Sequence, residues 1–171
     1  MTRPRRALLT GAIAATAILL IGTSLVRKPA VRLVWNASAS APEGLYFVAP
    51  GAPVATGDFV VAKVPAAYRG FAARRHYIPV GVPLVKQVAA VPGDQICALG
   101  GEIFRNGIPL AARRARDGAG RPMPAWQGCV RLGPDRYFLL MATQPASFDG
   151  RYFGVTDGRD ILGKAHLLWA R

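Results

Sequence analysis

The stretch PLVKQVAAVPGD, residues 83–94, places a single lysine inside an apolar run that is typical of a β-strand. Because alternate residues of a strand lie on the same face, Lys86 shares a face with Leu84, Val88 and Ala90. An ammonium group on an apolar face loses hydration, and this loss lowers its pKa. A neutral lysine is a competent general base for a serine hydroxyl. The alternative is that Lys86 reaches solvent from the edge of a sheet.

Short apolar runs of the same kind recur along the chain and predict a mainly-β domain, barrel-like or sandwich-like. The 19 glycines and 14 prolines of the sequence are spaced between and around these runs. The other predicted strands are LYFVA (45–49), DFVVAKV (58–64), QICAL (95–99), EIFRNGIPL (102–110), YFLLMAT (137–143) and KAHLLWA (164–170). Asn106-Gly107 predicts a tight hairpin turn. We also expect a helix over residues 65–75 and a long surface loop over residues 111–128.

One uncharged, largely apolar segment lies near the N-terminus, at residues 7–26. Roughly 20 residues rising 1.5 Å each match a hydrocarbon core of about 30 Å, whereas a cleavable leader has a shorter apolar region. The small-x-small triplet at 37–39 lies too far beyond the segment for ordinary leader cleavage. We therefore expect a retained transmembrane anchor at 7–26, a cytoplasmic N-terminus at 1–6, a juxtamembrane linker at 27–35 and a periplasmic domain at 36–171.

The chain is strongly basic, with 22 Lys and Arg against 9 Asp and Glu and a formal net charge of +13. The arginines are scattered, and no zinc-finger, helix-turn-helix or aromatic RNA-binding signature accompanies them. We expect no nucleic-acid partner. The basic surface is either simply solvated or attracted to the anionic lipid of the inner membrane.

Two cysteines, Cys97 and Cys129, have no histidine at metal-binding spacing, because His76 and His166 stand alone. We predict neither a metal site nor a cofactor. In a periplasmic domain the two cysteines either form a disulfide or remain as unpaired buried thiols.

The segment WNASASAPEGLY, residues 35–46, contains two serines before a predicted sharp turn at Pro42 and Gly44. Ser38 and Ser40 are two residues apart, so their hydroxyls lie on the same side of an extended chain. A nucleophile and a second hydroxyl donor on one side suit acyl transfer, where an oxyanion needs donors placed in advance. Alternatively the segment is a small-residue linker or turn, and Asn-Ala-Ser at 36–38 is formally a glycosylation sequon.

A third polar group lies in ASFDGRYFG, residues 146–154. Asp149 and Arg151 are expected to pair across one strand face, and Ser147 has the same parity. The pair is either a purely structural ion pair beside a turn, or it orients the lysine together with Ser147.

In this order behind an N-terminal anchor, these segments resemble the signal peptidase I clan, and within it the TraF-type conjugative transfer signal peptidases. The segments that carry the resemblance are SAPEGLY (40–46), PLVKQVAAVPGD (83–94), NG (106–107), GRPMP (120–124) and SFDGRYFG (147–154). Ser-x-Pro-x-Gly-Leu-Tyr is similar to the TraF nucleophile box, where ordinary signal peptidases carry Ser-Met-x-Pro. One departure is Gln87, at a position that is commonly Arg.

The resemblance implies a signal peptidase I-like β domain behind one transmembrane helix, and a serine endopeptidase that needs no cofactor. It implies that Ser40 is the nucleophile, Lys86 the general base and Asp149 an important acidic residue. It further implies that the Ser38 hydroxyl joins the Ser40 N–H in the oxyanion hole, and that Ser147 positions the lysine.

The resemblance also implies a substrate and partners. The substrate would be a conjugative pilin precursor or another membrane-inserted preprotein, whose ends the enzyme could also join into a cyclic pilin, and the partner would be the conjugative transfer apparatus. Two other functions stay open. One is a general signal peptidase I that removes leader peptides, and the other is a catalytically idle structural β domain of a mating-pore complex.

Overall fold

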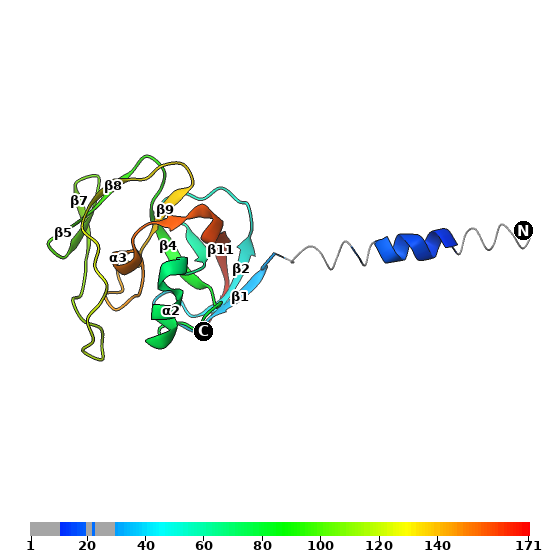
Figure 1. Cartoon of the computed structure of the whole chain (residues 1–171), viewed down its shortest axis with the longest axis horizontal. Helices are drawn as coiled ribbons and strands as arrows, with labels where there is room; N and C mark the ends of the chain where they lie inside the picture. Colours follow the sequence, from blue (N-terminus) through cyan, green and yellow to red (C-terminus); the bar gives the residue numbers. More distant parts are fainter. Residues whose placement is uncertain (1–10, 20–21, 23–29) are drawn as a thin grey trace, which may run out of the picture. The chain divides into compact units, whose positions relative to one another are not determined.

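The computed structural model describes residues 11–19, 22 and 30–171 (Figure 1). Residues 11–19 and 22 are helical, and the rest of the expected anchor at 7–26 lies outside the described residues. Within the part of the chain that the structure describes, no helix has both the length and the apolar character needed to cross a membrane. Val31–Arg171 form one compact unit, separate from the residues that precede it.

The larger sheet of this unit has seven strands in the order β1-β2-β11-β3-β4-β9-β10, and all of its strand pairs are antiparallel. The strands are β1 (Leu33–Asn36), β2 (Gly44–Ala49), β3 (Phe59–Ala62), β4 (Leu84–Ala90), β9 (Arg136–Leu139), β10 (Thr156–Asp157) and β11 (Ile161–Ala170). The fold is therefore mainly β, as the sequence predicts. The sequence run at 83–91 forms β4, in the interior of this sheet.

A second sheet has four strands in the order β7-β6-β5-β8. Its strands are β5 (Gln95–Leu99), β6 (Glu102–Arg105), β7 (Ile108–Ala112) and β8 (Gly128–Arg131). Figure 1 shows its labels β5, β7 and β8 together at one end of the unit, away from β1 and β2. The predicted hairpin is confirmed, because Asn106 and Gly107 connect β6 to β7 with φ angles of 50° and 80°. Both values are typical of the type I′ turn that joins twisted strands.

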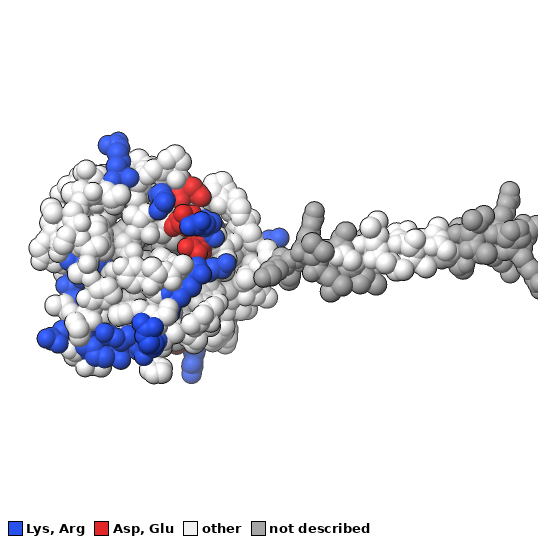
Figure 2. Space-filling model, viewed as in Figure 1, with Lys and Arg blue, Asp and Glu red and all other residues white. Residues whose placement is uncertain are grey.

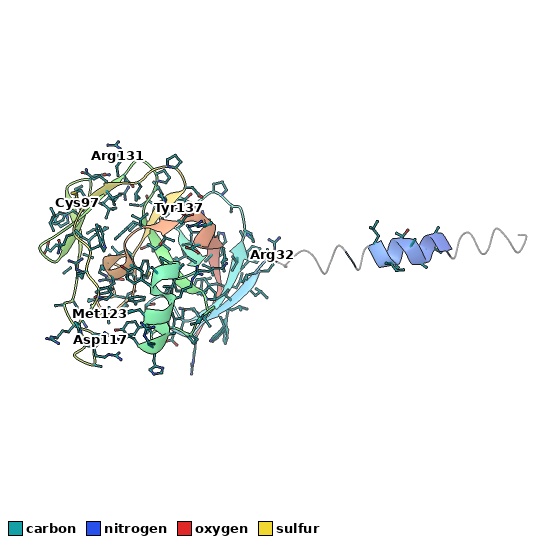
Figure 3. All side chains as sticks on the ribbon, viewed as in Figure 1. Arg32, Cys97, Asp117, Met123, Arg131 and Tyr137 are labelled. Atoms are coloured by element: carbon teal, nitrogen blue, oxygen red, sulfur yellow. A yellow bond between two sulfur atoms is a disulfide. The ribbon has the colours of Figure 1, made fainter. Side chains whose placement is uncertain are left out.

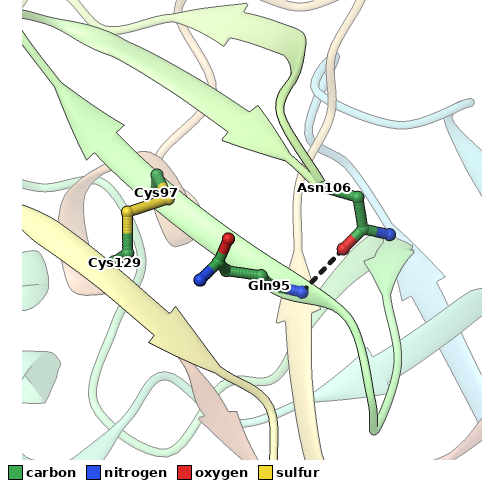
Figure 4. Close-up of a disulfide and its surroundings, with 4 residues drawn as sticks. All are labelled: Gln95, Cys97, Asn106 and Cys129. Carbon is green, nitrogen blue, oxygen red and sulfur yellow. Dashed lines mark hydrogen bonds between the residues drawn. A yellow bond between two sulfur atoms is a disulfide. The ribbon is translucent and has the colours of Figure 1, made fainter.

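The disulfide prediction is also confirmed, and the alternative of two free thiols is wrong. Cys97 in β5 and Cys129 in β8 are directly opposite each other and are joined by an S–S bond of 2.02 Å (Figure 4). On the same strand, the backbone N–H of Gln95 donates to the side chain of Asn106 over 2.8 Å. The disulfide therefore links an edge strand to the centre of the smaller sheet.

Helices are few and short in this unit. The predicted helix at 65–75 is confirmed as α2 (Ala66–Arg74), and a three-residue turn, η1 (Gly158–Asp160), precedes β11. The predicted ion pair of Asp149 and Arg151 is confirmed, but the expectation that it forms across a strand face is wrong, because the two residues lie at the start of α3 (Gly150–Phe153). The physical reason is capping, since the Asp149 carboxylate accepts the backbone N–H of Arg151 and begins a helical turn.

Three short strands lie where the sequence predicts none: β1, β8 and β10. Residues 33–35 of the expected linker belong to β1, which pairs with β2 along its whole length. None of these strands carries a long buried apolar run, because β1 and β8 are mostly exposed and β10 has only two residues. Pairing with a neighbouring strand, rather than local sequence, therefore determines where they form.

The core packs against both faces of β4. Val85 lies in a buried cluster with Tyr46 and Val48, while Leu84 and Val88 lie in another. Each such side chain contributes roughly 1.5–3 kcal/mol through burial. Because buried clusters cover both faces of the strand around Lys86, its side chain does not extend into open solvent. The solvent-reaching alternative for Lys86 is accordingly wrong, since this residue is only 3% exposed.

Candidate active site

The segment between β1 and β2 carries Ser38 and Ser40, and the Asn36 side chain organises it. The buried Asn36 amide Nδ2 donates to three carbonyl oxygens, those of Ser38, Ala41 and Pro42, at 2.9–3.1 Å. Its Oδ1 accepts the N–H of Ser38 at 3.2 Å. The Asn36 side chain therefore supplies hydrogen bonds to backbone groups of this turn that have no strand partner. Sequence reasoning treated it only as part of a sequon, although an Asn at the start of a turn is a known signal for such bonding.

The turn ends at Gly44, where β2 begins, and only glycine fits there. Its φ angle is 150°, and a Cβ atom would lie 2.0 Å from the backbone oxygen of Trp169 in β11. Glycine lacks this atom and allows the two strands to approach closely. The predicted turn therefore ends at a close contact between β2 and β11, four residues after Ser40.

Lys86 and Ser40 meet although 46 positions separate them. The Nζ atom of Lys86 lies 2.8 Å from the Oγ atom of Ser40 and 2.9 Å from the Oγ atom of Ser147. Burial lowers the pKa of Lys86 from 10.5 to about 8, and the nearby charges of Asp149 and Arg151 act in opposite directions. A substantial share of the amine is thus neutral near pH 8, and a neutral amine can accept a proton.

Ser38 lies beside Ser40 at the cleft. Its Oγ atom is 3.0 Å from the Oγ atom of Ser40, and it accepts the backbone N–H of Ser40 at 3.4 Å. The Ser38 hydroxyl and the Ser40 N–H are therefore adjacent donors beside the candidate nucleophile. That arrangement is chemically suited to an oxyanion.

Asp149 and Arg151 form a completely buried ion pair that supports Ser147 rather than touching the dyad. Arg151 donates to Asp149 through Nε at 2.9 Å and through Nη2 at 2.8 Å. Its Nη2 atom also donates to the Gln144 carbonyl at 2.7 Å, and the same carbonyl accepts the N–H of Ser147 at 3.0 Å. Among the described residues, the Asp149 carboxylate receives hydrogen bonds from Arg151 and from the Met141 N–H only.

A cleft of about 490 Å³ contains Ser38, Ser40, Lys86 and Ser147 in its lining. One wall comes from residues 35–38, which include the end of β1, and another from residues 82–86, at the start of β4. A third wall comes from the loop between β7 and β8, through Arg114, Arg116, Asp117, Gly118 and Met123. Sequence reasoning missed this third wall, since its residues read only as a surface loop, although GRPMP (120–124) belonged to the resemblance.

The chain is similar in sequence to a known protein family and to several individual proteins. Residues 5–170 match the family model described as signal peptidase, peptidase S26. The chain is 36% identical to a probable conjugal transfer protein TraF of Sinorhizobium fredii (strain NBRC 101917 / NGR234) over 76% of this chain and 73% of that protein. It is 31% identical to a plasmid transfer protein TraF of Escherichia coli over 85% of each.

A third relative is a conjugal transfer protein TraF of Agrobacterium fabrum (strain C58 / ATCC 33970), with 32% identity over 78% of this chain and 80% of that protein. Among solved structures, a signal peptidase I from Enterococcus faecalis V583 aligns with a TM-score of 0.38 and 17% identity. The alignment covers 68% of this chain and 98% of that one.

Proposed function

Since this chain belongs to the signal peptidase family, peptidase S26, we propose that it is a serine endopeptidase in which Ser40 and Lys86 form the catalytic dyad. The observation that carries the proposal is the 2.8 Å contact between Lys86 Nζ and Ser40 Oγ, made by a lysine that is 3% exposed. Arginine could not serve at this position, because its guanidinium stays protonated in proteins.

In the proposed mechanism, the neutral Lys86 amine accepts the hydroxyl proton of Ser40 while the Ser40 Oγ attacks the scissile carbonyl. The resulting oxyanion accepts the Ser40 N–H in place of the Ser38 Oγ, and the Ser38 hydroxyl turns to donate a second hydrogen bond to it. Lys86 then gives its proton to the leaving amine, and an acyl-enzyme remains. A second nucleophile, activated by the same lysine, releases the product.

Asp149 and Ser147 have positioning roles in this mechanism. The Ser147 hydroxyl lies 2.9 Å from Lys86 Nζ and keeps one amine hydrogen turned away from Ser40. The buried pair of Asp149 and Arg151 keeps the turn at Gln144–Ser147 in place. Asp149 therefore acts through Ser147 and not by contact with the reacting atoms.

We further propose that the substrate is a conjugative pilin precursor, processed at the inner membrane with the catalytic unit in the periplasm. The names of the relatives, which are conjugal and plasmid transfer proteins, support a role in conjugation. The apolar segment at 7–26 supports an anchor. The Cys97–Cys129 disulfide supports an oxidising compartment, since cytosolic proteins rarely keep such bonds. Inner-membrane lipid and the transfer apparatus would be its partners.

Co-expression with a candidate pilin precursor, followed by intact mass, tests this proposal. Wild type should convert the precursor to a shorter product, and a product lighter than the linear form by one water would identify ring closure by the substrate's own amine. Ser40→Ala and Lys86→Ala should leave the precursor intact. Lys86→Arg is the matched control for charge, and it should be equally inactive because it cannot deprotonate. Equal processing by wild type and Ser40→Ala would refute the dyad.

A further inference from the structure

The cleft has a basic wall that the proposed chemistry does not use. It belongs to residues 113–123, here called the cleft loop, which connects β7 towards β8. Arg114, Arg116, Asp117 and Met123 of this loop line the same cleft as Ser40 and Lys86. In Figure 2, Lys and Arg side chains gather along the lower edge of the compact unit, and Figure 3 places Asp117 and Met123 in that region.

The cleft loop is held in a defined shape by Asp117. Its carboxylate receives hydrogen bonds within the loop from Arg121 Nε at 2.8 Å and from the backbone N–H groups of Ala119 and Arg121. It is tied to the rest of the unit by the hydroxyl of Tyr77 and by Arg75 Nη1 at 3.3 Å. A short bridge between Arg116 and Pro122 closes the loop. Side chains carried by this loop are therefore preorganised at the cleft.

The only anion in this wall is already neutralised. The Tyr77 hydroxyl and the other donors hold the pKa of Asp117 well below its usual range, so the carboxylate stays charged. Two cations, Arg75 and Arg121, form ion pairs with it. The Asp117 cluster consequently carries no net negative charge into the cleft.

Arg114 and Arg116, by contrast, have no carboxylate within 4.0 Å among the described residues, and both are exposed. The Arg114 backbone is fixed, since its N–H donates to the hydroxyl of buried Tyr152 at 3.3 Å. Arg116 donates from Nη1 to the Gly120 carbonyl at 2.7 Å, which leaves its other guanidinium N–H groups free of protein partners among the described residues. Two unpaired guanidinium groups thus face a substrate cleft.

We propose that Arg114 and Arg116 are specificity-determining residues that bind a carboxylate of the peptide substrate, so that the cleft prefers substrates with negative charge near the cut. This inference rests on the proposed peptidase function. A peptide fits the observations better than a lipid headgroup, because the two arginines line the cavity that also contains the dyad. The carboxylate is either an acidic side chain or the carboxyl terminus of the substrate, and guanidinium recognises both in the same way.

The expected effect is moderate, because both arginines are exposed to solvent. An exposed ion pair corresponds to roughly a two- to fivefold change in binding, so each arginine should change KM by about that factor. The effect should appear in KM and not in kcat, since neither residue touches the reacting atoms. It should also shrink as salt is raised, because the Debye length falls from about 10 Å at 0.1 M to about 3 Å at 1 M.

The test uses the full chain in neutral detergent with quenched-fluorescence peptides that have small residues around the cut. One arm moves a single Glu, or a matched Gln, outward from the cut in peptides with amidated ends. In a second arm the peptides contain Gln and no Glu. Peptides with a free carboxyl terminus are compared with amidated ones as the terminus is moved further from the cut. The variants are Arg114→Gln and Arg116→Gln. The control is Arg131→Gln, because Arg131 is an exposed arginine of β8 that Figure 3 places at the upper edge of the unit, opposite Asp117 and Met123.

We expect wild type and Arg131→Gln to prefer the Glu peptide or the free carboxyl terminus at one position, and the cleft variants to lose that preference. Arg116→Lys keeps the positive charge and should therefore keep the preference. This variant distinguishes the loss of charge in Arg116→Gln from a change in the structure of the cleft loop. Arg114→Glu should favour a Lys peptide instead. Equal turnover of Glu and Gln peptides, or a preference that survives in both cleft variants, would overturn this inference while the peptidase function stands. If wild type cleaves none of the peptides, the peptidase function fails and this inference fails with it.

Discussion

The hydroxyl of Ser147 lies 2.9 Å from the Nζ atom of Lys86, although the two residues are 61 positions apart in the sequence. Ser147 is itself buried, at 3% exposure, and its backbone is fixed by the Gln144 carbonyl. The lysine amine therefore has two hydroxyl partners, Ser40 and Ser147, and only one of them is proposed to react. The second partner leaves the amine few orientations, which favours proton transfer from Ser40.

Removing this second partner should slow the chemical step. We expect Ser147→Ala to lower kcat by about 10- to 100-fold with little change in KM, because a misplaced base costs rate without altering peptide binding. Ser147→Thr, which keeps the hydroxyl, should recover part of the loss. Steady-state kinetics on a cleavable peptide measure both values. An unchanged kcat in Ser147→Ala would show that the hydroxyl is only a packing group.

The lowered pKa of Lys86, about 8, predicts a rising pH profile. Since the neutral amine is the active form, kcat/KM should rise about tenfold per pH unit below pH 8 and level off above about pH 9. Roughly a tenth of the lysine is neutral at pH 7. The profile should be measured in buffers of constant ionic strength. A flat profile between pH 6 and 9 would be incompatible with Lys86 as the base.

The lowered pKa of Lys86 should also make the stability of the fold depend on pH, which can be measured without a substrate. The folded pKa of about 8 lies below the ordinary value of 10.5, so the unfolded chain binds the proton more tightly between these values. Wild-type stability should therefore rise as pH increases from 8 to 10.5. Lys86→Met lacks this titration and should be more stable below pH 8 by about 3 kcal/mol, with the difference disappearing above pH 10.5. Urea unfolding at several pH values measures this difference.

Breaking the Asp149–Arg151 pair should destabilise the unit severely. Asp149→Asn leaves the guanidinium of Arg151, which is 1% exposed, without its counter-charge, and such a loss costs about 3–5 kcal/mol. The matched control is Arg159→Gln, since Arg159 pairs with Asp157 at 3.5 Å but its side chain is 83% exposed. That change should cost less than about 1 kcal/mol. Urea unfolding would contradict the prediction if the two variants lost similar stability.

Reduction of the disulfide should lower the melting temperature. Cys97 and Cys129 are 32 positions apart, and closing a loop of that length stabilises a domain by about 3–4 kcal/mol in the chain-entropy model. Thermal unfolding with and without a reductant measures the difference. The double variant Cys97→Ala/Cys129→Ala should resemble reduced wild type and should not respond to reductant. If the melting temperature of wild type is the same with and without reductant, the disulfide has no structural role.

Much of the sheet could be predicted locally, because its strands carry their own pattern. The run at 83–91 alternates over two buried faces, and it forms β4 with Lys86 inside. Asn106-Gly107 adopts the turn that its φ preferences favour. Local pattern failed where pairing or capping decides the structure. The start of β1 at Leu33 depends on pairing with β2. The α3 turn at Gly150 depends on capping by the Asp149 carboxylate, and the sequence pattern around Asp149 is equally compatible with a strand.

The sequence by itself determined which residues have the required chemistry: a lysine in an apolar strand, two nearby serines and an acid–base pair in a short segment. These features follow from the residue types and from spacing over a few positions. The tertiary structure alone decided that Lys86 meets both Ser40 and Ser147, and that the cleft loop forms a basic wall beside them. The physical reason is that these contacts join residues dozens of positions apart. Their geometry is therefore determined by strand pairing, core packing and the buried Asp149–Arg151 pair, and local sequence does not encode it.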